Sequence, residues 1–563
     1  MKSRAHKFCS AAPLLVAAIL ALCGGAAAGT WLPLALPAPG SVQLMLLLTD
    51  GSVMCFNGSP STACYRLTPG ANGSYTNGTW TTFASMASSR RYFSSQVLQS
   101  GKVIVAGAEY GTGGATTELF DPFANSWTNV PVPGGLLCAC PQTDGSNGAF
   151  RDSGSIMLPN GRVMVAPVFT VVTDQTLIYD PVANSWTGGP TALRSQNEAT
   201  WVKLPDNSIL TVDKNTSQSE RFMPASNQWI NDANVPVNLY GVGAEIGPAL
   251  LLPNGRAFFL GGSTSTALYL PTGNNNPGAW IAGPTIPNGQ ACPDAPAAML
   301  TDGHVLFACN PVGSGTNTFL TPVSFYEYDP VANTFTRQNS PTGGLTHNGL
   351  AAYQTSMLCL PDGTVLYSSE SSQLYVYVPS GPVLAAAKPT INSITVNSGG
   401  SFHLTGTQLN GLSQGASYGD DEQMDSNYPI VRLTDGANNV SYATTFNWSS
   451  TGVATGNATV ATEFFLPANI SQSGGPYSLV VIANGVASNP VGFNGPVWVD
   501  FNYTGVTQLG TFAQPFKTLA GGATAVAADG NVVIKPGSGF ENVTLSKAMT
   551  IVGGGGEATI FGQ

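Results

Sequence analysis

Short runs of apolar and β-branched residues recur along residues 50–369, and each run follows a two-residue turn signal. Such turn pairs supply the positive φ angles of tight hairpins, and the residues after them are strand formers. The seven pairs are Asp50-Gly51, Ser100-Gly101, Asn160-Gly161, Asp206-Asn207, Asn254-Gly255, Asp302-Gly303 and Asp362-Gly363. Their spacing of 46 to 60 residues is typical of β-propeller blades. The pattern therefore predicts seven blades closed into a ring around a central funnel.

A second phrase recurs with the first and reads as a strand, a proline-containing turn and a strand that opens with an aromatic residue. Near-copies span 119–127, 178–186 and 327–335, and a weaker copy spans 221–229. The phrase resembles the kelch repeat, in which the outer-strand aromatic packs between neighbouring blades. Unrelated β-hairpins are the alternative, but two phrases that recur together favour the propeller.

The pattern changes after residue 380, where Pro379 to Pro389 reads as a linker. Residues 389–495 contain short strands of alternating polarity, which indicates an immunoglobulin-like β-sandwich. Residues 496–563 resemble the first coils of a pectin-lyase-type β-helix, a solenoid that needs about three coils. We therefore expect an all-β chain with a seven-bladed kelch-type propeller at 29–380, the sandwich, and a short β-helix-like segment.

The first residues of the chain indicate secretion. Lys2, Arg4 and Lys7 precede an apolar run and a small-residue site at 26–28, which is a signal-peptide pattern over residues 1–28. A faint lipoprotein signal ends at Cys23, but Leu22 is bulky where a small residue is wanted. No later apolar segment is long enough to span a membrane. The net charge of −10 argues against a nucleic-acid partner.

Glycosylation and disulfides are further expectations for a secreted chain. After removal of the signal seven cysteines remain, and Cys55–Cys64 and Cys292–Cys309 are the plausible local pairs. Cys138 and Cys140 favour a loop disulfide or buried thiols over a metal site. Asn-x-Ser/Thr acceptors occur at Asn57, Asn72, Asn77, Asn215, Asn439, Asn447, Asn457, Asn469, Asn502 and Asn542.

A secreted kelch propeller followed by an immunoglobulin-like domain resembles galactose oxidase and glyoxal oxidase, the copper radical oxidases. The resemblance covers roughly residues 30 to 495 and is specific at residues 88–101 and 353–363. It implies that Tyr92 corresponds to the copper-ligand tyrosine that is thioether-linked to cysteine. Tyr353 then corresponds to the axial tyrosine, and Tyr110 to the aromatic residue that stacks over the crosslink.

The other residues that this resemblance implies are missing from the chain. No cysteine lies near Leu44, where the crosslinking partner would fall, and Gln354 stands where a histidine should follow the axial tyrosine. Residues 418–428 lack the second histidine, and beyond the signal only His304, His347 and His403 remain. Copper in a square site favours imidazole ligands. We therefore expect a retained scaffold without the redox site, and we keep a copper oxidase of alcohols or aldehydes, releasing hydrogen peroxide, as the alternative.

The repeat also predicts which residues meet at one rim of the funnel. Counting eight residues back from each turn reaches Val42, Tyr92, Asp152, Glu198 and Asp294, and counting nine back in the two other blades reaches Glu245 and Tyr353, beside Gln354. Converging carboxylates repel one another unless a cation or hydrogen-bond donors satisfy them. The rim is thus suited to sugar hydroxyls, a cationic group or Ca²⁺. The alternative is that each acid bonds backbone N–H groups of the next blade.

A second acidic group lies in the region after the propeller. Asp420, Asp421, Glu422 and Asp425 are candidate calcium ligands, although a solvated loop or a domain-docking contact is the favoured explanation. Neither a nucleophile elbow nor a metalloprotease helix motif occurs. The sequence therefore predicts a non-catalytic extracellular protein that binds a carbohydrate or another cell-wall or surface component at its funnel, without a copper cofactor.

Overall fold

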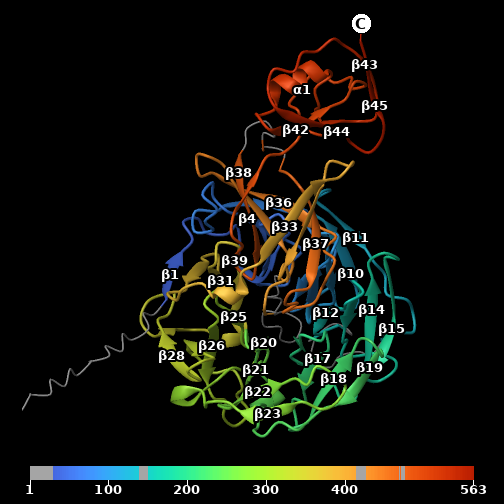
Figure 1. Ribbon diagram of the computed structural model, residues 1–563. Coiled ribbons are helices and arrows are strands. Elements are labelled where there is room, and N and C mark those ends of the chain that lie inside the picture. The colour runs from blue at the N-terminus through green and yellow to red at the C-terminus, as the bar shows by residue number, and fades with distance from the viewer. Residues whose placement is uncertain are drawn as a thin grey trace, which may run out of the picture.

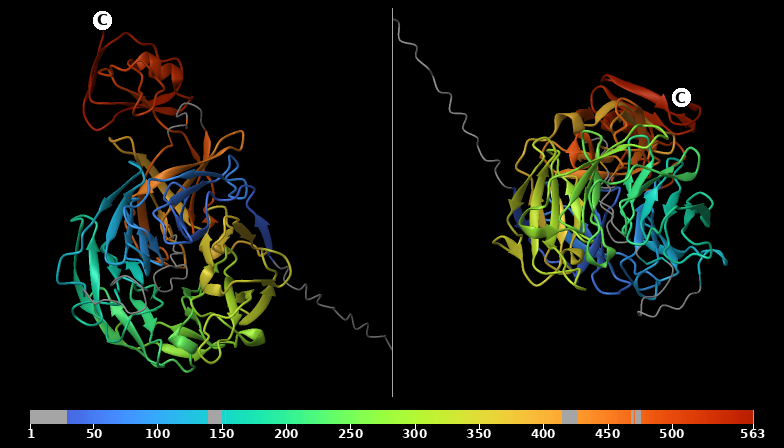
Figure 2. Two further views of the ribbon diagram at one scale, coloured as in Figure 1. Left: turned by 180° about the vertical axis from the view of Figure 1, so that it is seen from behind. Right: turned by 90° about the horizontal axis from the view of Figure 1, so that it is seen from below.

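Seven antiparallel sheets stand around a central axis and carry two further β-rich parts at one end (Figures 1 and 2). The computed structural model describes residues 29–138, 150–151, 153–413, 427–467, 470 and 476–562. The predicted signal peptide lies outside these residues. Within them, no helix is long and apolar enough to cross a membrane. The chain is all-β with a seven-bladed propeller, as the repeat predicts.

Each blade contains four principal strands, ordered from the axis outwards. Blades one to four comprise β2 (Val42–Leu47), β3 (Val53–Asn57), β4 (Cys64–Thr68) and β5 (Thr79–Thr82); β7 (Ser94–Val97), β8 (Val103–Ala106), β10 (Thr117–Asp121) and β11 (Ser126–Asn129); β12 (Ser155–Met157), β13 (Val163–Val165), β14 (Gln175–Asp180) and β15 (Ser185–Thr191); and β16 (Val202–Lys203), β17 (Ile209–Val212), β18 (Ser219–Met223) and β19 (Gln228–Asn231).

The remaining three blades follow the same order, and the sixth has two short extra strands. They comprise β20 (Ala249–Leu251), β21 (Ala257–Leu260), β22 (Thr266–Leu270) and β23 (Ala279–Ala282); β25 (Ala297–Met299), β26 (Val305–Pro311), β27 (Val323–Asp329) and β28 (Thr334–Gln338), with β24 (Gln290–Ala291) and β29 (Thr346–His347); and β30 (Ser356–Cys359), β31 (Val365–Ser368), β32 (Tyr375–Val378) and β1 (Thr30–Pro33).

The turn signals of the sequence sit between the first and second strand of every blade. All seven second turn residues have positive φ, from 66° at Asn207 to 90° at Gly303. At Gly51 the turn also lies against the ring of Tyr442, so a side chain there would be strained and would clash. These recurrent left-handed residues are the local cause of the blade repeat.

The ring is closed by β1, which pairs antiparallel with β32 and so supplies the outermost strand of the seventh blade. Trp31 on β1 packs edge-on against Phe325, Tyr367 and Tyr377, with ring centroids 4.8 to 5.3 Å apart. Its indole Nε1 donates to the carbonyl oxygen of Asn339 at 2.7 Å. Trp31 therefore joins the first strand of the propeller to both of the last two blades.

Outer-strand aromatics join other blades in the way that the kelch resemblance implies. Trp186 of the third blade donates to Thr117 Oγ1 of the second at 3.0 Å, and Trp280 of the fifth donates to Ser219 Oγ of the fourth at 3.2 Å. Each of these bonds crosses a blade boundary. The recurrent aromatic therefore links adjacent sheets.

Buried glutamates on the third strands hold the connections that enter their blades. Glu118 accepts hydrogen bonds from the backbone of Ala87 and Ser88 at 2.7 and 3.1 Å, and from Arg90 Nη2 at 2.8 Å. In the fourth blade Glu220 accepts from the backbone of Leu193 at 2.9 Å and from Gln196 at 2.6 Å. Glutamates of the third strands therefore bond backbone N–H groups, which is the alternative role that the sequence analysis considered for the rim acids.

The part after the propeller is one curled antiparallel sheet of eight strands, which agrees with the predicted sandwich. In sheet order these are β33 (Thr390–Val396), β34 (Phe402–Thr407), β37 (Thr459–Phe465), β36 (Val440–Phe446), β35 (Ile430–Thr434), β38 (Tyr477–Ala483) and β39 (Val486–Ala487), and β40 (Val491–Phe493) also pairs with β38. The sheet curls around a core that includes Leu404, Phe464 and Val481.

This sandwich covers the turn end of the propeller. Asn447 donates its backbone N–H to the carbonyl oxygen of Gln99 at 2.6 Å, and Thr445 does the same to Thr49 at 3.2 Å. The buried ammonium of Lys203 donates to the carbonyl oxygens of Met157 and Thr451, each at 2.7 Å. The innermost strands therefore end against the sandwich, and their opposite ends point away from it.

The last part has parallel pairing, as the predicted β-helix-like segment requires. Strands β41 (Val497–Val499), β42 (Gly530–Ile534) and β44 (Met549–Gly553) form one parallel sheet, and β43 (Gly537–Phe540) pairs in parallel with β45 (Ala558–Phe561). The helix α1 (Leu519–Ala525) packs over β41 and β42. Glu541 accepts from the backbone of Leu519 and Ala520 at the start of this helix.

The two predicted local disulfides, Cys55–Cys64 and Cys292–Cys309, are wrong, whereas Cys138 is disulfide-bonded. Cys55, Cys64, Cys292 and Cys309, together with Cys359, are buried free thiols. On the paired strands β3 and β4, Cys55 lies opposite Tyr65, and Phe56 lies opposite Cys64. The side chains of Cys55 and Cys64 therefore point to opposite faces of their sheet. The Cys309 thiol instead donates to Ser324 at 3.5 Å. Burial raises the pKa of Cys64 to about 12, as expected for an inert thiol in a packed blade.

Replacement of Trp31 by alanine tests the closure of the ring. We expect Trp31→Ala to lower the free energy of unfolding by about 2 to 3 kcal/mol, because three aromatic contacts and one hydrogen bond are lost. Phe123, 63% exposed on an outer turn, is a matched control whose alanine variant should change stability by less than about 0.5 kcal/mol. Chemical denaturation followed by fluorescence measures both, and equal stability of the two variants would contradict the closure role.

Glu220 predicts a pH dependence of stability. Burial raises its pKa from 4.5 to about 7, against the opposing hydrogen bond from Leu193 and the charge of Arg194. Between these values the folded chain keeps a proton that the unfolded chain has lost, so stability falls as the pH rises from 4.5 to 7, by up to about 3 kcal/mol. Glu220→Gln should flatten this part of the pH profile in denaturation experiments, whereas the exposed Glu557→Gln should not. A profile unchanged by Glu220→Gln would refute the assignment.

Candidate functional site

The candidate site lies at the end of the propeller that faces away from the sandwich. Tyr92 immediately precedes the innermost strand of the second blade, and the innermost strand of the seventh blade follows the 3₁₀ turn η3 (Ala352–Gln354). The short strands β6 (Arg90–Arg91) and β9 (Tyr110–Gly111) pair above the second blade and bring Arg91 opposite Tyr110. Residues from three separate stretches of the chain therefore meet at this rim.

A buried arginine holds the segment that carries the site. Arg90 is 1% exposed, and its Nη1 and Nη2 donate to Thr116 O, Thr116 Oγ1 and Glu118 Oε1 at 2.8 to 3.0 Å. The backbone of Glu109 donates to the carbonyl oxygens of Arg91 and Tyr92 at 3.1 and 2.9 Å. Since neighbouring side chains on a strand point to opposite faces, Arg90 anchors the segment and Arg91 extends into the site.

At the centre of the site the carboxylate of Glu370 accepts from three side chains. Arg91 Nη2 forms an ion pair with Glu370 Oε1, and the Tyr92 hydroxyl donates to the same oxygen at 3.3 Å. Gln354 Nε2 donates to Glu370 Oε2 at 3.3 Å. Arg91 Nη2 also donates to the Tyr92 hydroxyl oxygen at 2.7 Å, and its guanidinium lies 4.5 Å from the centre of the Tyr92 ring. The second and seventh blades are thus joined by one charge-assisted network.

Aromatic rings surround this network. The centroid of the Tyr92 ring lies 6.1 Å from that of Tyr110 and 6.4 Å from that of Tyr353, and Phe319 lies 4.6 Å from Tyr353. Tyr92 is buried, whereas Tyr110 is 40% exposed. We call Arg91, Tyr92, Tyr110, Tyr353, Gln354, Glu370 and Phe319 the rim cluster.

Burial and the neighbouring charges in the rim cluster shift the pKa values of Tyr353 and Arg91. Burial and the neighbouring charge of Glu370 raise the pKa of Tyr353, with smaller contributions from Asp294 and Glu109, while Arg91 opposes them. Burial alone would lower the pKa of Arg91, but the charges of Tyr92 and Glu370 outweigh it and raise that pKa. Near neutral pH Tyr353 therefore keeps its hydroxyl proton and Arg91 its positive charge.

The backbone at the rim is held in a sparsely populated conformation. Tyr92, Glu198 and Asp294 have φ of 50°, 54° and 50° at corresponding places in three blades, and Glu370 also has φ of 50°. A left-handed conformation costs such residues about 1 kcal/mol or more, and strain of this kind concentrates at functional sites. The positions found by counting back from each turn therefore share a left-handed backbone in these three blades.

The structure unites part of the predicted rim set. Tyr92, Tyr353 and Gln354 meet in the rim cluster, and the charge of Asp294 reaches Tyr353. Glu198 and Glu245 precede β16 and β20 at the corresponding entries of the fourth and fifth blades. Asp152 lies outside the described residues, as do Cys140 and the calcium candidates Asp420, Asp421, Glu422 and Asp425. Within the described part, no group of three His, Cys, Asp or Glu side chains is arranged to hold a metal ion.

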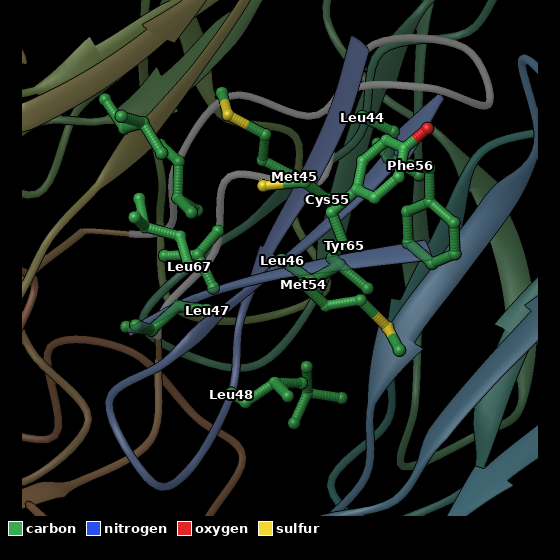
Figure 3. Packing of buried hydrophobic residues seen from close by; sticks show 14 of the residues in the cluster. Leu44, Met45, Leu46, Leu47, Leu48, Met54, Cys55, Phe56, Tyr65 and Leu67 are labelled. Atoms are coloured by element: carbon green, nitrogen blue, oxygen red, sulfur yellow. The ribbon is translucent and has the colours of Figure 1, made fainter. Parts of the chain in front are cut away.

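The residues at the site do not fit the copper centre that the oxidase resemblance implies. Leu44, near where the crosslinking cysteine would fall, is buried in the packed first blade (Figure 3). Gln354 Nε2 is a hydrogen-bond donor to Glu370, and its Oε1 accepts from the backbone of Ala351 at 3.0 Å. The tyrosines that the resemblance implies meet here, but the positions where it implies a thiol and an imidazole hold other residues.

The three histidines beyond the predicted signal peptide have other partners. His347 Nδ1 lies 3.1 Å from the Tyr367 hydroxyl, and burial lowers its pKa. His304 lies within 4 Å of Asp302, Glu327 and Asp329, which raise its pKa. His403 lies on β34 of the sandwich. The imidazoles are therefore used in packing and in surface charge pairs.

Three residues of the rim cluster, Arg91, Phe319 and Glu370, were not predicted from the sequence. Glu370 follows its turn, whereas the offset count examined only positions that precede a turn. Arg91 stands directly beside Tyr92, so its proximity was visible, but nothing in the repeat indicated which way its side chain points. Only the closed ring brings Arg91 to Glu370, 279 residues away in the chain.

The predicted glycan acceptors differ in their surroundings. Asn57 is half-buried, its amide donates to the Tyr65 hydroxyl at 2.9 Å, and its carbonyl oxygen accepts from Ser41 at 3.0 Å. Asn469 lies outside the described residues. The other eight are exposed, namely Asn72, Asn77, Asn215, Asn439, Asn447, Asn457, Asn502 and Asn542.

No family model and no curated protein matches the sequence. Similar solved structures include a fungal alcohol oxidase of the AA5 family in complex with copper, at 14% identity and a TM-score of 0.49, covering 83% of this chain and 100% of that one. Another is YjhT, at 15% identity and a TM-score of 0.36, covering 54% and 99%. A third is an inactive virginiamycin B lyase from Staphylococcus aureus with quinupristin, at 11% identity and a TM-score of 0.40, covering 62% and 99%. At such identities the similarity concerns the fold alone, which the strand pairing itself establishes.

Titration of Tyr353 tests the electrostatics of the rim cluster. Removing the charge of Glu370 leaves Arg91 unopposed, so Glu370→Gln should lower the pKa of Tyr353 towards 10.0, the ordinary value for tyrosine. Ultraviolet difference absorption of the phenolate follows the titration, and Tyr353→Phe identifies the band. Glu557→Gln is the control for an unrelated acid. An unchanged Tyr353 titration in Glu370→Gln would show that the two groups are not coupled.

Proposed function

We propose that this chain is a secreted, non-catalytic binding protein that holds a carbohydrate of a cell wall or cell surface at the rim cluster. The observation that carries the proposal is the aromatic group around the Arg91–Glu370 network at one mouth of the propeller. The predicted signal peptide and the exposed glycan acceptors support an extracellular location.

The chemistry of the rim cluster suits a sugar ring. Aromatic faces pack against the apolar C–H faces of sugars, and Tyr110 is exposed while it contacts the buried Tyr92. Sugar hydroxyls need donors and acceptors whose positions are already set. Arg91, Tyr92 and Gln354 are held by Glu370 before any ligand arrives, so little side-chain entropy is lost on binding.

The same contacts argue for binding without catalysis. A general base must reach the proton that it abstracts, but Glu370 already accepts from three donors. The acids at the rim recur because the blade itself recurs. They are therefore weak evidence for a pair of catalytic carboxylates in a hydrolase. The copper radical oxidase remains the alternative, favoured by the convergence of Tyr92, Tyr110 and Tyr353 and opposed by the missing thiol and imidazoles.

Binding of purified full-length protein to an array of cell-wall and surface glycans tests the proposal. For a glycan that binds, calorimetry should show about a tenfold loss of affinity for Tyr110→Ala and for Glu370→Gln. The exposed Phe123→Ala should bind like the wild type. Absence of any saturable glycan, or equal affinity of Tyr110→Ala and Phe123→Ala, would refute carbohydrate binding at the rim cluster.

Two further measurements separate the alternatives. Alanine at Glu198 and Glu245 distinguishes a ligand-binding rim from a structural one, because loss of melting temperature with intact glycan affinity would assign these acids to stability alone.

Copper analysis and electron paramagnetic resonance of purified protein should show neither stoichiometric Cu(II) nor a tyrosyl radical. Either signal would establish the oxidase instead.

A further inference from the structure

A second cavity lies far from the propeller rim, at the junction between the sandwich and the C-terminal segment. Its volume is about 650 Å³. Phe465 and Leu466 at the end of β37 and the tip of the β33–β34 hairpin at Gly399 and Gly400 form one wall, and Tyr503, Phe512 and Gln514 form the other. We call it the junction cavity. Its size and its position between two folded parts are typical of ligand sites.

The aromatic walls of the junction cavity are fixed. Phe465 stacks on Phe446 with centroids 4.9 Å apart and is 39% exposed. The Tyr503 hydroxyl donates to the carbonyl oxygen of Thr507 at 3.0 Å. Phe512 is held edge-on by Trp498 at 4.8 Å. Rings on both walls can therefore receive a flat apolar face without reorganising.

Positive charge lies beside these rings. The ammonium of Lys535 lies 4.0 Å from the centre of the Phe512 ring and 3.6 Å from Asp500, so it is paired. The ammonium of Lys517 lies 6.0 Å from the centre of the Tyr503 ring, and no carboxylate of the described residues lies within ion-pair distance of it. In contrast, Lys547 is bound by the carbonyl oxygens of Thr524 and Val526. Lys517 is thus placed to pair with a negative charge carried by a ligand.

We propose that the junction cavity binds an acidic saccharide, whose ring faces pack on Tyr503 and Phe465 and whose carboxylate pairs with Lys517. Aromatic stacking and a cation together select a sugar that has both an apolar face and an anionic group. This site is separate from the rim cluster and does not depend on its function. It places a saccharide site beside the C-terminal segment, whether or not the rim cluster binds a glycan.

The test uses the full chain and two matched probes, an oligoglucuronate trimer and the neutral glucose trimer of the same linkage. Calorimetry should show saturable binding of the acidic trimer that weakens as salt is added, and at least about tenfold weaker binding of the neutral trimer. Lys517→Gln should reduce this difference to less than about threefold. Lys388→Gln, a lysine exposed on the linker, should leave it unchanged.

Further variants separate local folding from recognition. Tyr503→Phe keeps the ring and should keep binding, whereas Tyr503→Ala should lose it with an unchanged melting temperature. The rim variant Tyr110→Ala should bind the acidic trimer like the wild type. Equal affinity for the two trimers, wild-type behaviour of Lys517→Gln, or loss of binding in Tyr110→Ala would each overturn the proposal.

Discussion

Closure of the ring is the constraint on which the rest of this structure depends. The first described strand, β1, pairs with β32, so that Thr30 lies opposite Val378. Without that pairing the seventh blade would lack its outermost strand, and the aromatic faces of Phe325 and Tyr367 would lose Trp31. The rim cluster needs the same closure, because Arg91 and Glu370 come from blades near opposite ends of the propeller sequence.

Whether a feature of this structure can be predicted from the sequence depends on whether its contacts are local in the chain or join distant residues. The turn positions at Gly51, Asn207 and Gly303 are local, since a left-handed residue determines its own hairpin, and they were predicted correctly. The convergence of Tyr92 and Tyr353 followed from the repeat and from the family resemblance. The partner of Arg91 was not predictable, since it depends on how a closed ring places a loop of another blade. The Cys55–Cys64 pair failed because proximity in the chain does not set the face of a strand to which a side chain points.

The polar side chains of the rim cluster are bound chiefly to one another. Three tyrosines converge, and the position after Tyr353 holds an amide that donates to a carboxylate. That carboxylate is also held by a guanidinium and a phenol, so the polar groups satisfy one another. The left-handed backbone at Tyr92 and Glu370 lies at the same residues that make these contacts, so backbone strain and the polar network coincide.

The docking of the sandwich on the turn end has a consequence for any polymer that approaches the propeller. Tyr428, Trp448 and Thr451 of the sandwich pack against the inner-strand residues Val97, Met157 and Lys203. The sandwich therefore closes the passage along the propeller axis on that side. A long glycan strand cannot be threaded through the molecule from one face to the other. A polymer bound at the opposite mouth would have to enter and leave through that mouth.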